Sequence, residues 1–110
     1  MALTAKDNCD YETCVALKEL GYDDVTHYYF NKDGVRTPRI PLYEAQKWLR
    51  EEKNIIVYPE KNSFGWYYAI HYNVGEVHQL KFSDEYDSYE EALSEGIKEA
   101  VKILKEKDND

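Results

Sequence analysis

Two cysteines and three histidines are the side chains in this 110-residue sequence best suited to bind a metal ion or to carry a proton. Cys9 and Cys14 have four residues between them, and no second cysteine pair follows. A structural zinc site needs four converging ligands, and only His27, His71 and His78 are left to complete one. The sequence therefore predicts free thiols, no metal site and no cofactor.

The histidines lie in segments with the composition of strands, and none has an obvious nucleophile or acidic residue beside it to orient it. The local motifs of serine hydrolases, P-loop proteins, zinc peptidases and dinucleotide-binding proteins are absent. We therefore predict a protein without catalytic residues. An enzyme whose active site combines residues far apart in the sequence stays an alternative.

Acidic residues are concentrated near the C-terminus. The net charge is −8, and residues 83–110 contain ten acidic residues against four basic ones. Ordered carboxylates can imitate the phosphates of a nucleic acid. However, Glu90 and Glu91 fall at the start of a predicted helix and lysines fall at its end, the arrangement that a helix dipole favours. We favour a solvated helix face, with Glu90 and Glu91 as candidate partner-binding residues.

Aromatic residues make up 15% of the sequence, and the segment 66–72 is the richest in them. Alternation along a strand places Trp66, Tyr68, Ile70 and Tyr72 on one face, which we predict to be the core face. Tyr67, Ala69 and His71 lie on the other face. We expect the N-terminal helix and hairpin to cover that face, and the alternative is an exposed face on which Tyr67 and His71 bind a partner.

These residues need elements to position them, and the N-terminal part of the chain predicts a helix and a hairpin. Asp10 can cap a helix that ends at Gly21. Residues 25–30 are rich in β-branched and aromatic side chains, residues 31–34 form a turn, and residues 35–40 return as an edge strand because they contain Pro38.

The remaining chain predicts a core in the order α-β-β-β-α over residues 41–105. Apolar residues recur at helical spacing after Pro41, and Ser88 with Glu91 forms a capping box at the start of the last helix. Gly96 would allow that helix to approach the sheet closely. The predicted elements are a helix over 41–53, strands over 55–58 (closed by Pro59), 66–72 and 76–82, and a helix over 88–105.

The fold class predicted is therefore α+β, an antiparallel three-stranded meander flanked by helices, preceded by an N-terminal helix and β-hairpin. We expect a single domain over residues 1–110, with an N-terminal subregion at 10–40 and a frayed tail at 106–110. The N-terminal residues lack an apolar leader, and no stretch is long enough to span a bilayer, so we expect a cytoplasmic protein without a membrane partner.

Two segments resemble a family of small uncharacterised proteins encoded by gut bacteria and their prophages. They are LYEAQKWLR at residues 42–50, and SYEEAL at residues 88–93 with Gly96-Ile97 and Glu99-Ala100 after it. The resemblance covers about the last two-thirds of the chain. It implies no known activity, and so it assigns no functional residue.

The order of elements over 41–105 is also similar to that of double-stranded RNA-binding domains, and its strands and last helix to HicB-like antitoxins. RNA-binding domains of that kind place lysines at the start of the last helix, where this chain has Glu90 and Glu91. An acidic antitoxin-like protein could instead neutralise a basic toxin.

The leading hypothesis is thus a non-catalytic interaction protein, of phage or mobile-element origin, whose partner is another protein. A nucleic-acid-associated domain and an enzyme with a scattered site are the alternatives. The oligomeric state is open, since an edge strand can pair with a second copy.

Overall fold

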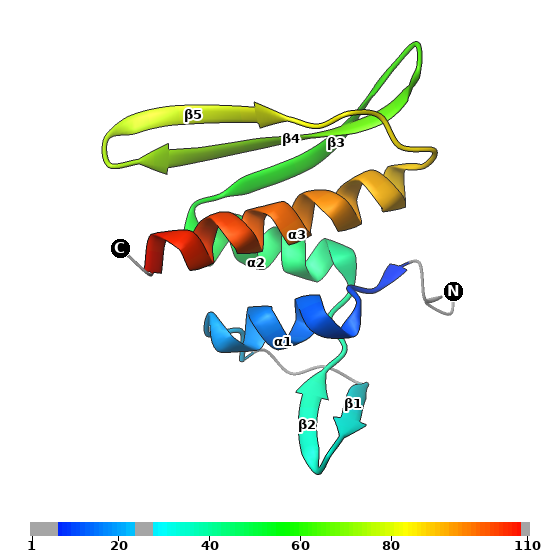
Figure 1. Ribbon diagram of the computed structural model, residues 1–110, viewed down its shortest axis with the longest axis vertical. Helices are drawn as coiled ribbons and strands as arrows, with labels where there is room; N and C mark the ends of the chain where they lie inside the picture. Colours follow the sequence, from blue (N-terminus) through cyan, green and yellow to red (C-terminus); the bar gives the residue numbers. More distant parts are fainter. Residues whose placement is uncertain (1–6, 24–27, 109–110) are drawn as a thin grey trace.

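The computed structural model describes residues 7–23 and 28–108. Within them the chain forms three helices and five strands, and Figure 1 shows how they follow one another. Their bounds are α1 Tyr11–Glu19, β1 Tyr29–Lys32, β2 Val35–Pro38, α2 Leu42–Lys53, β3 Ile56–Asn62, β4 Gly65–Val74, β5 Val77–Phe82 and α3 Tyr89–Asp108. The predicted α+β fold, with its antiparallel meander, N-terminal helix and hairpin, is confirmed.

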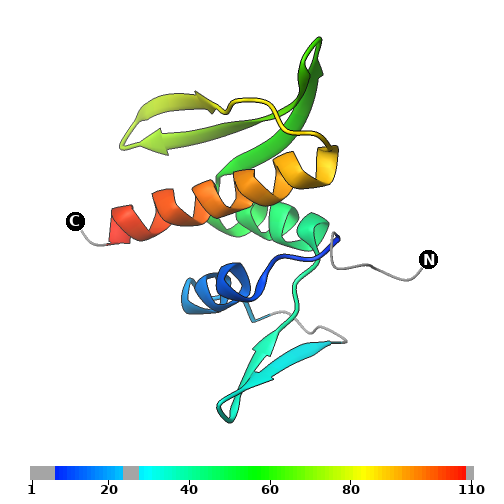
Figure 2. The ribbon, with the colours of Figure 1, turned by 45° about the vertical axis from the view of Figure 1, so that its right-hand side comes forward.

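The elements are arranged in layers, which Figures 1 and 2 show from two directions. The sheet β3-β4-β5 forms one layer, and α3 lies against one of its faces, in contact with β3 and β4. α2 contacts α3 and β3, and α1 contacts α3 and β2 on the side away from the sheet. The expectation that the N-terminal helix and hairpin cover the sheet is therefore wrong. Cys14 and Leu17, two of the three buried residues of α1, belong to the core cluster formed with α2 and α3.

α3 packs on the sheet through the apolar stripe that its sequence predicts. From the helix, Leu93, Ile97, Ala100 and Val101 are buried, and the sheet contributes Val57, Tyr68 and Ile70. The predicted core face of β4 is thus confirmed. A Cβ atom on Gly96 would lie 2.7 Å from Val57 Cγ1 and 3.0 Å from Tyr68 Cβ, so the absence of a side chain at Gly96 lets the helix sit this close.

The helix starts follow the predicted capping chemistry. The Asp10 side chain accepts a hydrogen bond from the Thr13 N–H at 2.8 Å, and the Ser88 hydroxyl accepts one from the Glu91 N–H at 3.1 Å. Pro41 lies one position before the first residue of α2 and has extended backbone. α3 continues to Asp108, three residues beyond the predicted end, because Glu106 and Lys107 favour helix and no breaker precedes them.

Two strands differ from their predicted extents. β3 does not end at Pro59 but continues to Asn62, because the backbone of Pro59 faces the outer edge of the sheet and loses no bond to β4. The first hairpin strand is shorter than residues 25–30: β1 begins at Tyr29, and residues 25–27, including His27, lie outside the described residues. Asp33 and Gly34 make the hairpin turn with positive φ angles of 52° and 77°.

The close approach at Gly96 gives a stability prediction. Gly96→Ala gains about 1 kcal/mol of helix propensity, but its methyl group overlaps branched and aromatic carbons that cannot swing away, at a cost of about 1–3 kcal/mol. We expect the free energy of unfolding in urea to fall by about 1 kcal/mol. Lys102→Ala, at an exposed position of the same helix, should change it by less than about 0.5 kcal/mol. A more stable Gly96→Ala protein would contradict the packing described.

Candidate functional site

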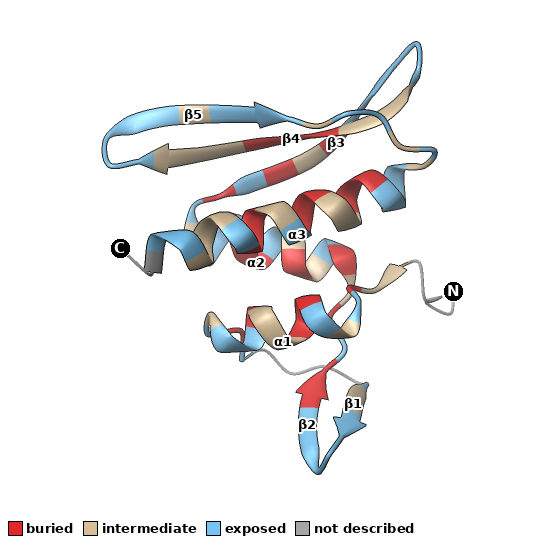
Figure 3. Cartoon of the chain, viewed as in Figure 1, coloured by how far each residue is buried: buried red, intermediate tan, exposed pale blue. Residues whose placement is uncertain are grey.

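The face of the β3-β4-β5 sheet that turns away from α3 is uncovered in the described part of the chain. Register and strand alternation place ten residues on it besides Asn62 and Gly65 at the β3–β4 turn, and we call these ten the open face. They are Ile56, Tyr58 and Glu60 of β3, Tyr67, Ala69, His71 and Asn73 of β4, and His78, Leu80 and Phe82 of β5. Figure 3 shows β5 exposed along most of its length.

Three large apolar side chains of the open face are exposed to solvent. The exposed fractions are 57% for Phe82, 46% for Leu80 and 39% for Ile56. Phe82 also contacts the ring of Tyr67 edge to face, with centroids 5.9 Å apart. The open face therefore combines apolar and aromatic contact surface on a rigid sheet, which is typical of the centre of a protein interface.

A chain of hydrogen bonds crosses the open face from β3 to β5. The Tyr58 hydroxyl lies 3.0 Å from His71 Nε2, and His71 Nδ1 lies 3.0 Å from His78 Nε2. The three rings are stacked in sequence, with interplanar angles of 17° and 21°. The bond between the imidazoles requires that one of its two nitrogens donates a proton and the other accepts it, so the tautomers of the two rings are coupled.

A shallow hollow of about 300 Å³ adjoins this chain. Its lining contains Ile56, Tyr58, His71 and His78 together with asparagines and Tyr72, and it contains no serine, cysteine, lysine or carboxylate. The hollow thus offers proton donors and acceptors and an apolar wall. It lacks the usual nucleophiles of covalent catalysis.

Formal charge on the open face is small. Glu60 is its carboxylate, and it accepts a hydrogen bond from the Tyr67 hydroxyl, which raises the pKa of Tyr67. The strand residue Lys81 points to the other face of the sheet, where its Nζ lies 2.6 Å from Glu99 Oε1. No lysine or arginine belongs to the open face, so it carries no cation with which to hold a phosphate.

The other predicted partner-binding pair lies elsewhere. Glu90 and Glu91 are exposed in the first turn of α3 and line a groove of about 540 Å³ with Asp10, Glu95 and Lys98, away from the open face. The structure therefore does not bring the four candidate residues together. It places Tyr67 and His71 on the open face and the two glutamates on a separate acidic groove.

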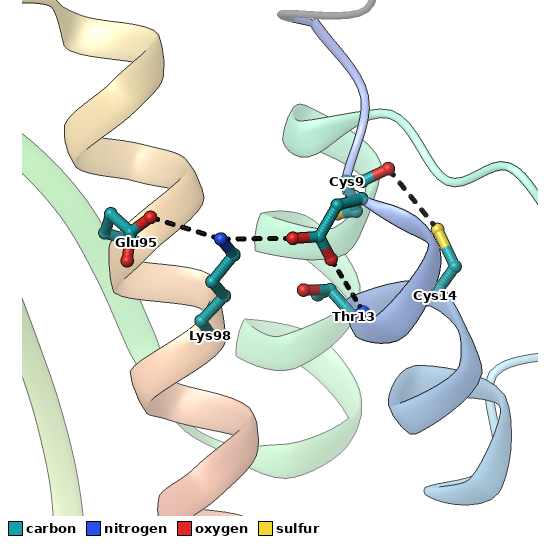
Figure 4. A network of polar contacts seen from close by, with 6 residues as sticks. Cys9, Thr13, Cys14, Glu95 and Lys98 are labelled. Atoms are coloured by element: carbon teal, nitrogen blue, oxygen red, sulfur yellow. Dashed lines mark hydrogen bonds and ion pairs between the residues drawn. The ribbon is translucent and has the colours of Figure 1, made fainter.

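The cysteines lie where the N-terminal segment meets α1, in the junction shown in Figure 4. The Cys14 thiol donates to the Cys9 carbonyl at 3.6 Å, and the Ile40 N–H donates to Cys14 Sγ at 3.5 Å. Cys9 is 3% exposed and Cys14 is fully buried. This arrangement makes them polar members of the core.

The two thiols affect each other's acidity. The hydrogen-bonding contact between the two thiol groups, together with burial, raises the pKa of Cys9 well above its usual value. The same contact between the thiols and the hydrogen bond from the Ile40 N–H outweigh burial and lower the pKa of Cys14. Cys14 is thus the more acidic thiol, but burial shields it from reagents in solution.

Next to the cysteines, Asp10 links α1 to α3. Lys98 Nζ lies 3.0 Å from Asp10 Oδ2 and 3.1 Å from Glu95 Oε1 (Figure 4). Burial raises the pKa of Asp10, but the hydrogen bonds from Thr13 and the contact with Lys98 outweigh it, so the pKa is lowered overall. The junction therefore fixes the entry to α1 with a charged contact at the surface.

Among residues 7–23 and 28–108, no three histidine, cysteine or acidic side chains converge where a metal ion could sit. No helix in the same residues is long and apolar enough to cross a membrane.

Sequence reasoning found part of the open face. It identified Tyr67 and His71 but missed Tyr58, His78, Leu80 and Phe82. The alternation of His78, Leu80 and Phe82 was visible in the sequence. What placed them beside His71 was the register of the β4–β5 hairpin, which its two-residue turn fixes.

A scan of protein-family models, a search of curated proteins and a search of solved structures each found no match for this chain.

Burial of the cysteines predicts slow chemical labelling. In the native protein we expect both thiols to react with an aromatic disulfide reagent at least roughly 100-fold more slowly than in the denatured chain, because the reagent must wait for local opening. Cys9→Ser and Cys14→Ser assign any signal to one thiol. Fast native labelling of Cys14 would contradict a purely structural pair.

The Asp10 contact predicts a pH-dependent stability difference. Its folded-state pKa is lowered, so its contribution is present above the unfolded value of about 4 and is lost as the pH falls below it. Asp10→Asn keeps a capping residue but removes the charge. We expect it to cost up to about 1 kcal/mol at pH 7, as for other exposed ion pairs, and less at pH 3.

Urea unfolding at both pH values measures this difference, with the exposed Glu51→Gln as control. A difference between wild type and Asp10→Asn that grows as the pH falls would have the wrong sign.

Proposed function

We propose that this protein is a non-catalytic binding module that docks an apolar patch of another protein on its open face. The observation that carries the proposal is a set of exposed apolar side chains on the sheet face that α3 does not cover: Leu80 and Phe82, two positions apart on β5, and Ile56 on β3, across His71 from Leu80. Single exposed apolar residues are common, but several of them on one face of a sheet favour a partner that covers that face.

Charge determines the partner's chemistry. The open face has little charge of its own, while the protein as a whole carries −8. A fitting partner therefore has an apolar centre with lysines or arginines around it. The negative charge of this protein would attract those basic residues at long range, and the apolar centre would exclude water from the contact. The same lack of cations on the open face argues against RNA or DNA as the ligand.

The hollow beside Tyr58, His71 and His78 fits a binding surface better than an active site. It is shallow, and the side chains that line it supply proton transfer without a nucleophile or a carboxylate. We therefore assign Tyr58 and His71 to binding, where their rings and polar atoms provide contact area and specificity. An accessory role in a phage or mobile element is the setting that the sequence resemblance suggests for such a module.

Paired bait variants test this proposal. Leu80→Thr with Phe82→Thr removes apolar surface from the open face but keeps β-forming residues, and Val35→Thr is a matched change at an exposed position of β2. We expect a protein captured from cells of the source organism by wild type and by Val35→Thr to be recovered at least roughly 10-fold less with the double variant.

The captured protein is then purified and titrated against each variant by calorimetry. The proposal is supported if only the double variant loses affinity and if added salt weakens binding by the wild type. Equal binding by all three baits would overturn it, and so would the absence of any partner whose capture depends on the open face.

A further inference from the structure

The two outer edges of the β3-β4-β5 sheet differ in whether their backbone groups are satisfied. In an antiparallel pair, successive residues turn their N–H and C=O groups alternately toward the partner strand and away from it. The Ser83 N–H donates to the Tyr68 carbonyl at 3.1 Å, which fixes this alternation for β4 and β5. The residues of β5 whose backbone groups face outward are therefore His78, Leu80 and Phe82.

The β3 edge is blocked in two ways. The side chain of Gln46, from α2, donates to the outward-facing carbonyl of Val57 at 2.7 Å. Two residues further along, Pro59 has no N–H to offer. A strand from another molecule would find the Val57 acceptor occupied and no donor at Pro59, so a regular ladder along this edge is interrupted.

The β5 edge has neither protection. No described strand pairs with its outer side, and the strand Val77–Phe82 contains no proline. Its one permanently charged residue, Lys81, turns to the helix side and is neutralised by Glu99, so it does not repel an incoming strand. α3 lies mainly against β3 and β4, which leaves space beside β5 for another sheet.

We propose that β5 pairs antiparallel with β5 of a second copy, with Leu80 opposite Leu80, to form a six-stranded sheet. In this register His78 lies opposite Phe82, and Gln79 lies opposite Lys81. No like charges therefore meet within the strand. The pairing uses the edge of the sheet and goes beyond the proposed function, which uses its face.

A second copy suits this edge because the sequence of β5 is compatible with its own reverse. The six residues of β5 give a contact about 20 Å long at about 3.4 Å per residue. We expect a contact of this length to bury less surface than a standard interface, which buries roughly 800 Å² per partner. We therefore expect a weak dimer, with a dissociation constant of roughly micromolar to millimolar. At each end Glu76 comes opposite Asp84 of the second copy, so two carboxylates repel each other there. Each copy also carries a net charge of −8, and because added salt screens this repulsion, salt strengthens the dimer.

The flanking acids give a test of the register with purified protein. Analytical ultracentrifugation at low salt measures the dimer dissociation constant. Glu76→Lys places a cation opposite Asp84 at both ends and should tighten the dimer at least roughly 5-fold more than Glu51→Lys, which makes the same charge change far from the edge. Combining Glu76→Lys with Asp84→Lys restores like charges and should remove that gain.

A second variant tests the backbone pairing itself. Leu80→Pro removes an N–H that points away from β4, so the fold keeps its internal ladder while the dimer loses bonds at its centre. We expect Leu80→Pro to be folded by circular dichroism and monomeric, whereas Leu80→Thr, which keeps the N–H, still dimerises. A wild-type protein that is monomeric at millimolar concentration and high salt overturns the proposal, as does a gain for Glu76→Lys no larger than for Glu51→Lys.

Discussion

The packing of α3 against one face of the sheet is the contact on which the rest of the structure depends. α3 can approach β3 and β4 so closely because Gly96 places no atom between them. Its apolar stripe then faces the sheet, and α2 fills the space beside it. With these apolar surfaces used on one side, the described chain has no element left to cover the other side of the sheet. The open face is therefore uncovered because the apolar surfaces of α2 and α3 pack on the opposite side of the sheet and against each other.

The polar side of α3 has a structural role of its own. Lys98 contacts Asp10 at the start of α1, and Lys105 contacts Glu19 at its end, with Nζ and Oε2 2.7 Å apart. Each exposed pair contributes little free energy, but the two together orient α1 along α3. Much of the charge near the C-terminus is thus explained by the capping of α3 and its contacts with α1. Glu90 and Glu91 lie in the first turn of α3, on exposed acidic surface that these contacts do not use.

Local chemistry in the sequence predicted the elements well, because caps, turns and apolar periodicity act over a few residues. Asp10, Ser88 and Gly96 have the roles that their positions indicated. The errors arose where a distant part of the chain decides the outcome. Whether Tyr67 and His71 are covered depends on where α1 packs, and no local pattern records that choice. Pro59 predicts a strand end, and this prediction is wrong because the sequence does not show that the nitrogen of Pro59 faces the outer edge of the sheet.

The face and the edge of the sheet recognise partners by different physics. The open face acts through side chains, so substitutions at Leu80 or Phe82 alter its specificity without changing the backbone. The β5 edge acts through N–H and C=O groups, which every residue except proline supplies, so its specificity depends on register and on flanking charge. Pairing two copies along β5 would place their open faces side by side on one continuous sheet. A partner with two apolar patches would then gain affinity from simultaneous contact with both faces, which a monomer cannot provide.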